Sequence, residues 1–145
     1  MMRELVVNLA KEISVEVSLP IPRCEAITYA FYTKEERPLV QDELQRAEGV
    51  LAQVIQVPLL SHQRDALLCL VSDLLGGYAS SLSTNFEDSA LVKLLNSGTY
   101  QLAAAEFFKF CYVCGKIDKR VWRKRNVEQL LFVRGTLNLP LTNGG

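Results

Sequence analysis

The sequence lacks the features that mark several specialised classes of protein. Its apolar runs are far shorter than the roughly 18–20 residues needed to cross a bilayer, so no membrane-spanning segment is predicted. Sixteen basic and sixteen acidic side chains cancel, which gives no overall electrostatic attraction to nucleic acid or membranes. The first residues do not form the charged and apolar pattern of a signal peptide, so no leader is expected. These absences favour an ordinary soluble globular protein.

Cysteine and histidine are too sparse for a recognisable metal site. The four cysteines are Cys24, Cys69, Cys111 and Cys114, and the one histidine is His62. Cys111 and Cys114 form a lone C-x-x-C without the second cysteine pair or paired histidines of a zinc site. We expect reduced thiols that are mostly buried as small apolar residues. No metal, no cofactor and no catalytic role for His62 is predicted.

Apolar side chains recur at helical spacing over most of the 145 residues, a length typical of one domain. The pattern predicts helices over residues 3–15, 39–57, 61–76, 90–96, 100–113 and 118–133. Residues 24–33 are rich in Thr, Tyr, Phe and Ile and predict a short strand or hairpin. The expected fold is a single α+β domain that is predominantly helical.

Four segments resemble the phage lysozyme family, in the same order as in that family. They are residues 57–67 (VPLLSHQRDAL), 91–98 (LVKLLNSG), 104–116, which contain AAEF and CYVCGK, and 121–132 (VWRKRNVEQLLF). The resemblance implies a lysozyme-like fold with a small N-terminal β region and a helical C-terminal lobe. It divides the chain into an N-terminal helix with a reduced hairpin (1–38), a linking helix (39–57), a helical lobe (58–134) and a tail (135–145).

The resemblance also implies the chemistry of a muramidase, which hydrolyses the β-1,4 bond between N-acetylmuramic acid and N-acetylglucosamine. Such cleavage needs a carboxylic acid that protonates the leaving oxygen and a group that places water near the anomeric carbon. Laid over the family pattern, Glu16 takes the place of the acid, Cys24 lies near the water and Thr28 orients it. Glu12 and Glu25 are rival acids. The implied substrate is the glycan strand of peptidoglycan, cleaved by a monomer made in the host cytoplasm that acts on the cell wall after release.

A second function stays open because residues 28–33 (TYAFYT) replace the glycine- and histidine-bearing hairpin of the family. Glycines permit tight turns and close approach of a substrate, and Ala or Tyr would hinder both. The alternative is a lysozyme-fold binding or scaffold protein without catalysis.

The basic run near the C-terminus has three interpretations. Arg123, Lys124 and Arg125 are most simply a solvated basic face, or else they attract an anionic wall polymer. A nucleic-acid contact of residues 119–125 is disfavoured by the zero net charge, and no nucleic-acid partner is expected. Trp122 is expected to pack rather than to stack on a sugar.

Overall fold

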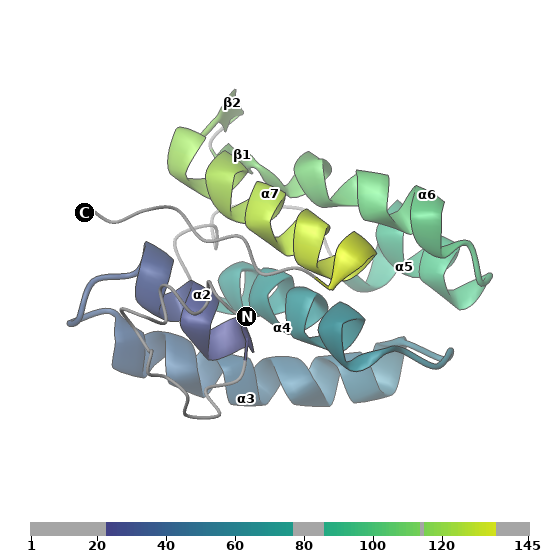
Figure 1. Ribbon diagram of the computed structural model, residues 1–145, viewed down its shortest axis with the longest axis horizontal. Helices are drawn as coiled ribbons and strands as arrows, with labels where there is room; N and C mark the ends of the chain where they lie inside the picture. The colour runs from purple at the N-terminus through teal and green to yellow at the C-terminus, as the bar shows by residue number, and fades with distance from the viewer. Residues whose placement is uncertain (1–22, 77–85, 114, 136–145) are drawn as a thin grey trace.

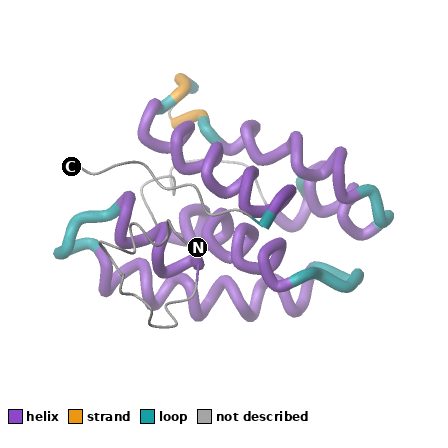
Figure 2. Tube along the Cα trace, viewed as in Figure 1, coloured by secondary structure: helices purple, strands orange, loops and turns teal. Residues whose placement is uncertain are grey.

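The computed structural model describes residues 23–76, 86–113 and 115–135. These residues fold almost entirely as helices, with one two-stranded hairpin at one end (Figure 2). The elements are α2 (Arg23–Phe31), α3 (Arg37–Val54), α4 (Ser61–Gly76), the 3₁₀ helix η2 (Phe86–Asp88), α5 (Ala90–Asn96), α6 (Tyr100–Ala105), the 3₁₀ helix η3 (Glu106–Phe110), β1 (Tyr112–Val113), β2 (Lys116–Ile117) and α7 (Lys119–Arg134). The expectation of a predominantly helical fold is confirmed. No helix among the described residues is long and apolar enough to cross a membrane.

Helix α4 is the centre of the packing. It lies between α3 on one side and α7 on the other and also contacts α2, while α5 and α6 lie beyond α7 (Figure 1). Its residues from Ala66 to Val71 are all at most 2% exposed, because neighbouring helices cover several of its faces. A helix that is apolar on all sides is typical of such a central position. The prediction for residues 61–76 is confirmed.

The strand or hairpin expected over residues 24–33 is wrong, because residues 23–31 form helix α2. Cys24, Ile27 and Thr28 are spaced by three and four residues and are all buried, which is the pattern of one helix face. That face packs on α4. The β propensity of Thr, Tyr and Ile is a weak preference that such packing overrides. An isolated hairpin would also lack further strands to support it.

The linking helix is displaced toward the N-terminus relative to its prediction. Helix α3 begins at Arg37 and ends at Val54, whereas residues 39–57 were expected. Pro38 lies in the first helical turn, where proline is tolerated because the backbone N–H groups there have no partner within the helix. Pro38 therefore belongs to the helix, which begins two residues earlier than expected.

The single helix expected over residues 100–113 is also wrong. The chain forms α6, then the 3₁₀ turn of η3, then β1. Phe107 and Phe110 are both buried, and their spacing of three matches the three residues per turn of a 3₁₀ helix. Gly115 follows at φ +83°, which permits the tight turn into β2.

Side-chain caps define the starts of α5 and α7, and both helices are confirmed close to their expected bounds. The Ser89 hydroxyl accepts from the Val92 amide at 3.3 Å, and the Asp118 carboxylate accepts from the Val121 amide at 3.0 Å. These bonds satisfy amide groups that lack a partner within the first turn. The predicted helix at residues 3–15, the tail and the division into lobes stay predictions, since residues 1–22 and 136–145 lie outside the described part.

Replacing Gly135 with alanine is expected to lower the free energy of unfolding by about 1–2 kcal/mol. Gly135 caps α7 at φ +72°, and an added Cβ would lie 3.2 Å from the His62 ring. The matched control is Gly49→Ala in α3, where nothing lies within 4 Å, which should instead stabilise by about 0.5–1 kcal/mol. Urea unfolding of both variants measures the two changes in the free energy of unfolding. An equal loss of stability for Gly49→Ala and Gly135→Ala would contradict the left-handed cap at Gly135.

Candidate functional site

The structure places two of the three predicted site residues on helix α2. Cys24 and Thr28 lie one turn apart, while Glu16 and its rival Glu12 lie outside the described residues. Glu25, the other rival acid, lies next to Cys24 and is partly exposed. The structure therefore brings Cys24 and Thr28 together and leaves the position of Glu16 relative to them a prediction.

Cys24 and Thr28 face the interior. Cys24 is 7% exposed and Thr28 is 2% exposed. The Thr28 hydroxyl donates to the carbonyl oxygen of Cys24 at 2.9 Å, and the Cys69 thiol donates to the same oxygen at 3.6 Å. A hydroxyl engaged in this way within the core has little freedom to orient a substrate water. As placed here, both side chains fix α2 against α4.

The environment of Cys24 also disfavours thiolate chemistry. Burial, followed by the negative charge of Asp65, raises the pKa of the Cys24 thiol to about 12. A thiol with that pKa is protonated near neutral pH and is a weak nucleophile. Among the described residues, no group of histidine, cysteine and acidic side chains is arranged to hold a metal ion.

Ellman's reagent is expected to leave Cys24 and Cys69 unmodified in the folded protein. Burial raises the pKa of both thiols, and both side chains lie within the core. Mass-spectrometric mapping of the modified cysteines, with and without denaturant, measures this. Rapid labelling of Cys24 in the folded chain would place it at an open cleft and restore the role predicted from the sequence.

The start of α2 is held by a polar contact to α4. The Arg23 guanidinium pairs with the Asp65 carboxylate at 2.8 Å and donates to the Ser61 hydroxyl at 2.8 Å. This contact fixes the point at which the segment that carries Glu16 joins the described fold.

A network of buried charged side chains lies at the other end of α2. Asp73 of α4 is paired with Lys124 of α7 at 3.0 Å and with Arg125 of α7 at 2.5 Å. Glu128 pairs with Lys124 at 2.6 Å and also with Arg125. The Tyr32 hydroxyl, one residue beyond α2, donates to Asp73. The four charged side chains are at most 1% exposed and their charges balance.

The pKa directions in this network agree with its geometry. Burial raises the pKa of the Asp73 carboxyl. The positive charges of Lys124 and Arg125 lower it by more than burial raises it, so the pKa lies below its ordinary value. Burial lowers the pKa of the Lys124 ammonium, but Asp73 and Glu128 raise it well above its ordinary value. These groups are therefore charged at neutral pH. The network joins α4, α7 and the end of α2 through ionic hydrogen bonds within the core.

The expectation that Arg123, Lys124 and Arg125 form a solvated basic face is wrong for two of the three. Lys124 and Arg125 are buried and ion-paired, and Arg123 alone is exposed. Two signals in the sequence could have shown this. Glu128 lies four residues after Lys124 and three after Arg125, the spacing of side chains that meet on a helix. Asp73 lies in the mostly apolar second half of α4, where a carboxylate needs a buried partner.

The comparisons with known proteins agree with this architecture. The family model of phage lysozyme matches residues 21–128. An endolysin of Bacillus phage PZA is 30% identical over 103 residues, which cover 71% of this chain and 37% of that protein. An endolysin of Bacillus phage B103 is 26% identical over 130 residues, 81% of this chain and 46% of the relative. This chain spans less than half the length of these curated relatives. It belongs to the phage lysozyme family.

Proposed function

We propose that the chain is an endolysin-type lysozyme that hydrolyses the β-1,4 bond between N-acetylmuramic acid and N-acetylglucosamine in peptidoglycan. The observation that carries this proposal is the family match, which extends over residues 21–128 and includes α2 and most of α7. Both curated relatives are named endolysins, which supports the same reaction. A protein of this kind needs no cofactor for glycosidic hydrolysis, since two polar side chains and a water molecule suffice.

In this proposal Glu16 is the general acid. It lies seven positions before Arg23, the residue that anchors the start of α2 to Asp65. A glutamic acid partly buried beside a cleft keeps its proton near neutral pH because loss of solvent raises its pKa. The roles of Cys24, near the water, and Thr28, orienting it, stay predictions; both side chains are buried in the packing described.

The cellular setting follows from the same proposal. The substrate is the glycan strand of peptidoglycan, and the active species is a monomer. The protein is made in the host cytoplasm and reaches the wall after release, through an opening made by another protein such as a holin. Nucleic acid has no part in this activity.

The experiment is lysis of Gram-negative cells stripped of their outer membrane, followed as loss of turbidity. The full chain should lyse the cells, and Glu16→Gln should lower the rate on the order of 100- to 10,000-fold, the usual contribution of a general acid. Glu12→Gln and Glu25→Gln are the matched controls and should keep most of the activity. Unchanged lysis by a folded Glu16→Gln variant would contradict the assignment of the acid.

A second candidate function is binding of the wall without cleavage. The observation that favours it is α2 itself, which is a packed helix at the residues where the family has a glycine-bearing hairpin. Under this function the folded chain sediments with purified cell-wall sacculi and produces no lysis at any concentration. Lysis that depends on Glu16 excludes it.

A further inference from the structure

The hairpin β1–β2 leads into α7 at one corner of the molecule (Figure 1). Three large apolar side chains on these elements are exposed. Tyr112 and Ile117 are cross-strand partners, so they share one face of the hairpin. They are 46% and 55% exposed, and Trp122, in the first turns of α7, is 44% exposed. Trp122, which was expected to pack, is only partly covered; the centroid of its ring lies 5.9 Å from that of Phe108.

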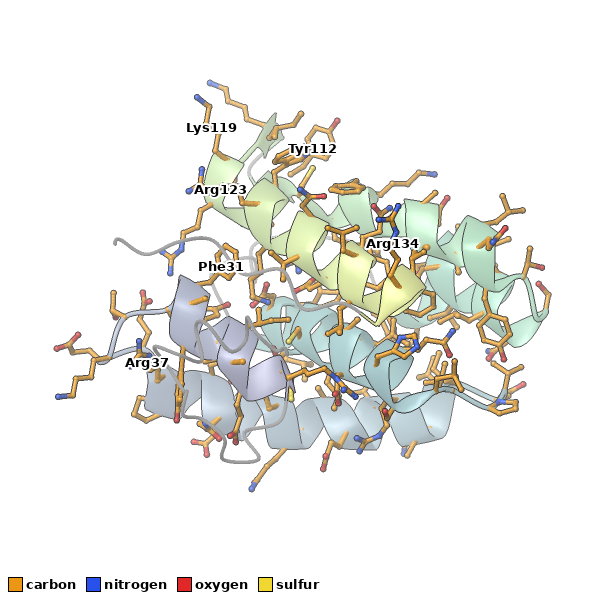
Figure 3. All side chains as sticks on the ribbon, viewed as in Figure 1. Phe31, Arg37, Tyr112, Lys119, Arg123 and Arg134 are labelled. Carbon is orange, nitrogen blue, oxygen red and sulfur yellow. The ribbon has the colours of Figure 1, made fainter. Side chains whose placement is uncertain are left out.

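Three exposed cations lie on the same hairpin and the same helix as these apolar groups. Lys116, Lys119 and Arg123 are exposed, and within the described ranges none of them forms an ion pair. Lys119 and Arg123 extend outward from the start of α7, and Tyr112 lies on β1 at the same end of the molecule (Figure 3). The acid of this stretch, Asp118, is engaged in capping α7. A chain without net charge therefore carries a local positive surface here, which we call the aromatic–basic corner (Tyr112, Ile117, Trp122, Lys116, Lys119 and Arg123).

We propose that the aromatic–basic corner docks the protein on the surface of an anionic phospholipid bilayer. Tryptophan and tyrosine favour the headgroup level of a membrane, where an apolar ring and a polar edge are both accommodated. Lysine and arginine around them bind the phosphate groups, and their apolar stems pass along the same surface. The corner projects at one end of the molecule, so it contacts a flat surface without rearrangement of the helices.

Two other occupants fit the corner less well. A glycan strand stacks on aromatic rings, but Ile117, the most exposed of the three apolar residues, offers a sugar neither a ring face nor a hydrogen-bonding group. A second copy of the chain, related by a twofold axis, would bring the same three cations close together, and like charges at close range oppose such a contact. An anionic bilayer satisfies both the apolar and the charged groups.

The chain carries its own probe for this contact, because Trp122 is its one tryptophan. The full chain is titrated with vesicles of equal parts phosphatidylglycerol and phosphatidylcholine, and with vesicles of phosphatidylcholine alone. The anionic vesicles should shift the Trp122 emission to shorter wavelength, and brominated lipid should quench it. Phosphatidylcholine should produce neither effect, and added salt should reverse the binding, because it screens the charges.

Substitutions separate this contact from general adhesion. The triple variant Lys116→Gln, Lys119→Gln, Arg123→Gln should lower the partition coefficient on the order of 100-fold, as each cation near an anionic membrane contributes roughly fivefold. Lys93→Gln, on the exposed side of α5, is the control and should bind within twofold of the parent. Circular dichroism checks that each variant is folded.

Four results would overturn the proposal. Equal binding to both kinds of vesicle would remove the role of the cations. A loss on Lys93→Gln as large as that of the triple variant would place the contact elsewhere. An emission shift with purified sacculi but not with vesicles would assign the corner to the wall. A shift that rises with protein concentration alone, together with a doubled mass, would assign it to a second copy. Lysis of stripped cells is a separate readout, so neither proposal depends on the other.

Discussion

Replacing Arg125 with methionine is expected to lower the free energy of unfolding by about 3–5 kcal/mol, because it leaves buried carboxylates without their partner. Arg125 is fully buried and pairs with Asp73 and Glu128, and its Nε donates to the Phe110 carbonyl at 3.2 Å. Methionine fills much of the same volume but supplies none of these bonds. Urea unfolding followed by circular dichroism measures the change.

The matched control for this prediction lies two residues away on the same helix. Arg123→Met removes the same kind of side chain from an exposed position that has no ion pair within the described part of the chain. Surface changes of this type are usually within about 0.5 kcal/mol of the parent. Equal changes in the free energy of unfolding for the two substitutions would contradict the buried network. They would instead support the exposed basic face that was predicted from the sequence.

Acid should destabilise the parent more steeply than a variant that lacks the Asp73 carboxylate. Burial raises the pKa of Asp73, but Lys124 and Arg125 lower it to below its ordinary value. A carboxyl whose pKa is lower in the folded than in the unfolded state contributes stability above the unfolded value of about 3.9. That contribution is lost as the pH falls through the folded pKa.

The test compares the parent with Asp73→Asn at several values of pH between neutral and strongly acidic. At neutral pH, Asp73→Asn should be less stable by about 3–5 kcal/mol, because Lys124 and Arg125 lose a buried partner. The difference should narrow as the pH falls below about 4, where the parent loses the same charge. A difference that stays constant at every pH would show that Asp73 is not ionised in the folded protein.

The helices that the sequence predicts well are those that begin or end at capping or helix-terminating residues. The start of a helix is marked by Ser89 before α5 and by Asp118 before α7, and the end of α4 is marked by Gly76. Each of these residues acts on the neighbouring backbone alone, so its effect can be predicted from the local sequence. The errors occur where tertiary contacts decide. Residues 24–33 have the composition of a strand, yet α2 forms because Cys24, Ile27 and Thr28 complete the packing on α4.

The candidate site shows the same division between local and long-range information. The family resemblance, carried by residues in α4, α5 and α7, is confirmed by the match over residues 21–128. Burial of Cys24 and Thr28 depends on which face of α2 meets α4. This face could not be predicted from the sequence, because residues 24–33 were predicted to form a strand rather than a helix. The Asp73 network joins residues more than fifty positions apart. When each helix is considered alone, Lys124 and Arg125 have no visible partner in α4, and they are predicted to be exposed to solvent.

The central claim, that this member of the phage lysozyme family cleaves the glycan strand, is tested most directly by the ends it leaves on purified peptidoglycan. Sacculi are incubated with the full chain, reduced with borohydride and analysed by mass spectrometry. The proposal predicts new reducing ends on N-acetylmuramic acid, and none with Glu16→Gln. Reducing ends on N-acetylglucosamine, cleavage within the peptide, or intact sacculi after incubation with the folded parent would contradict it.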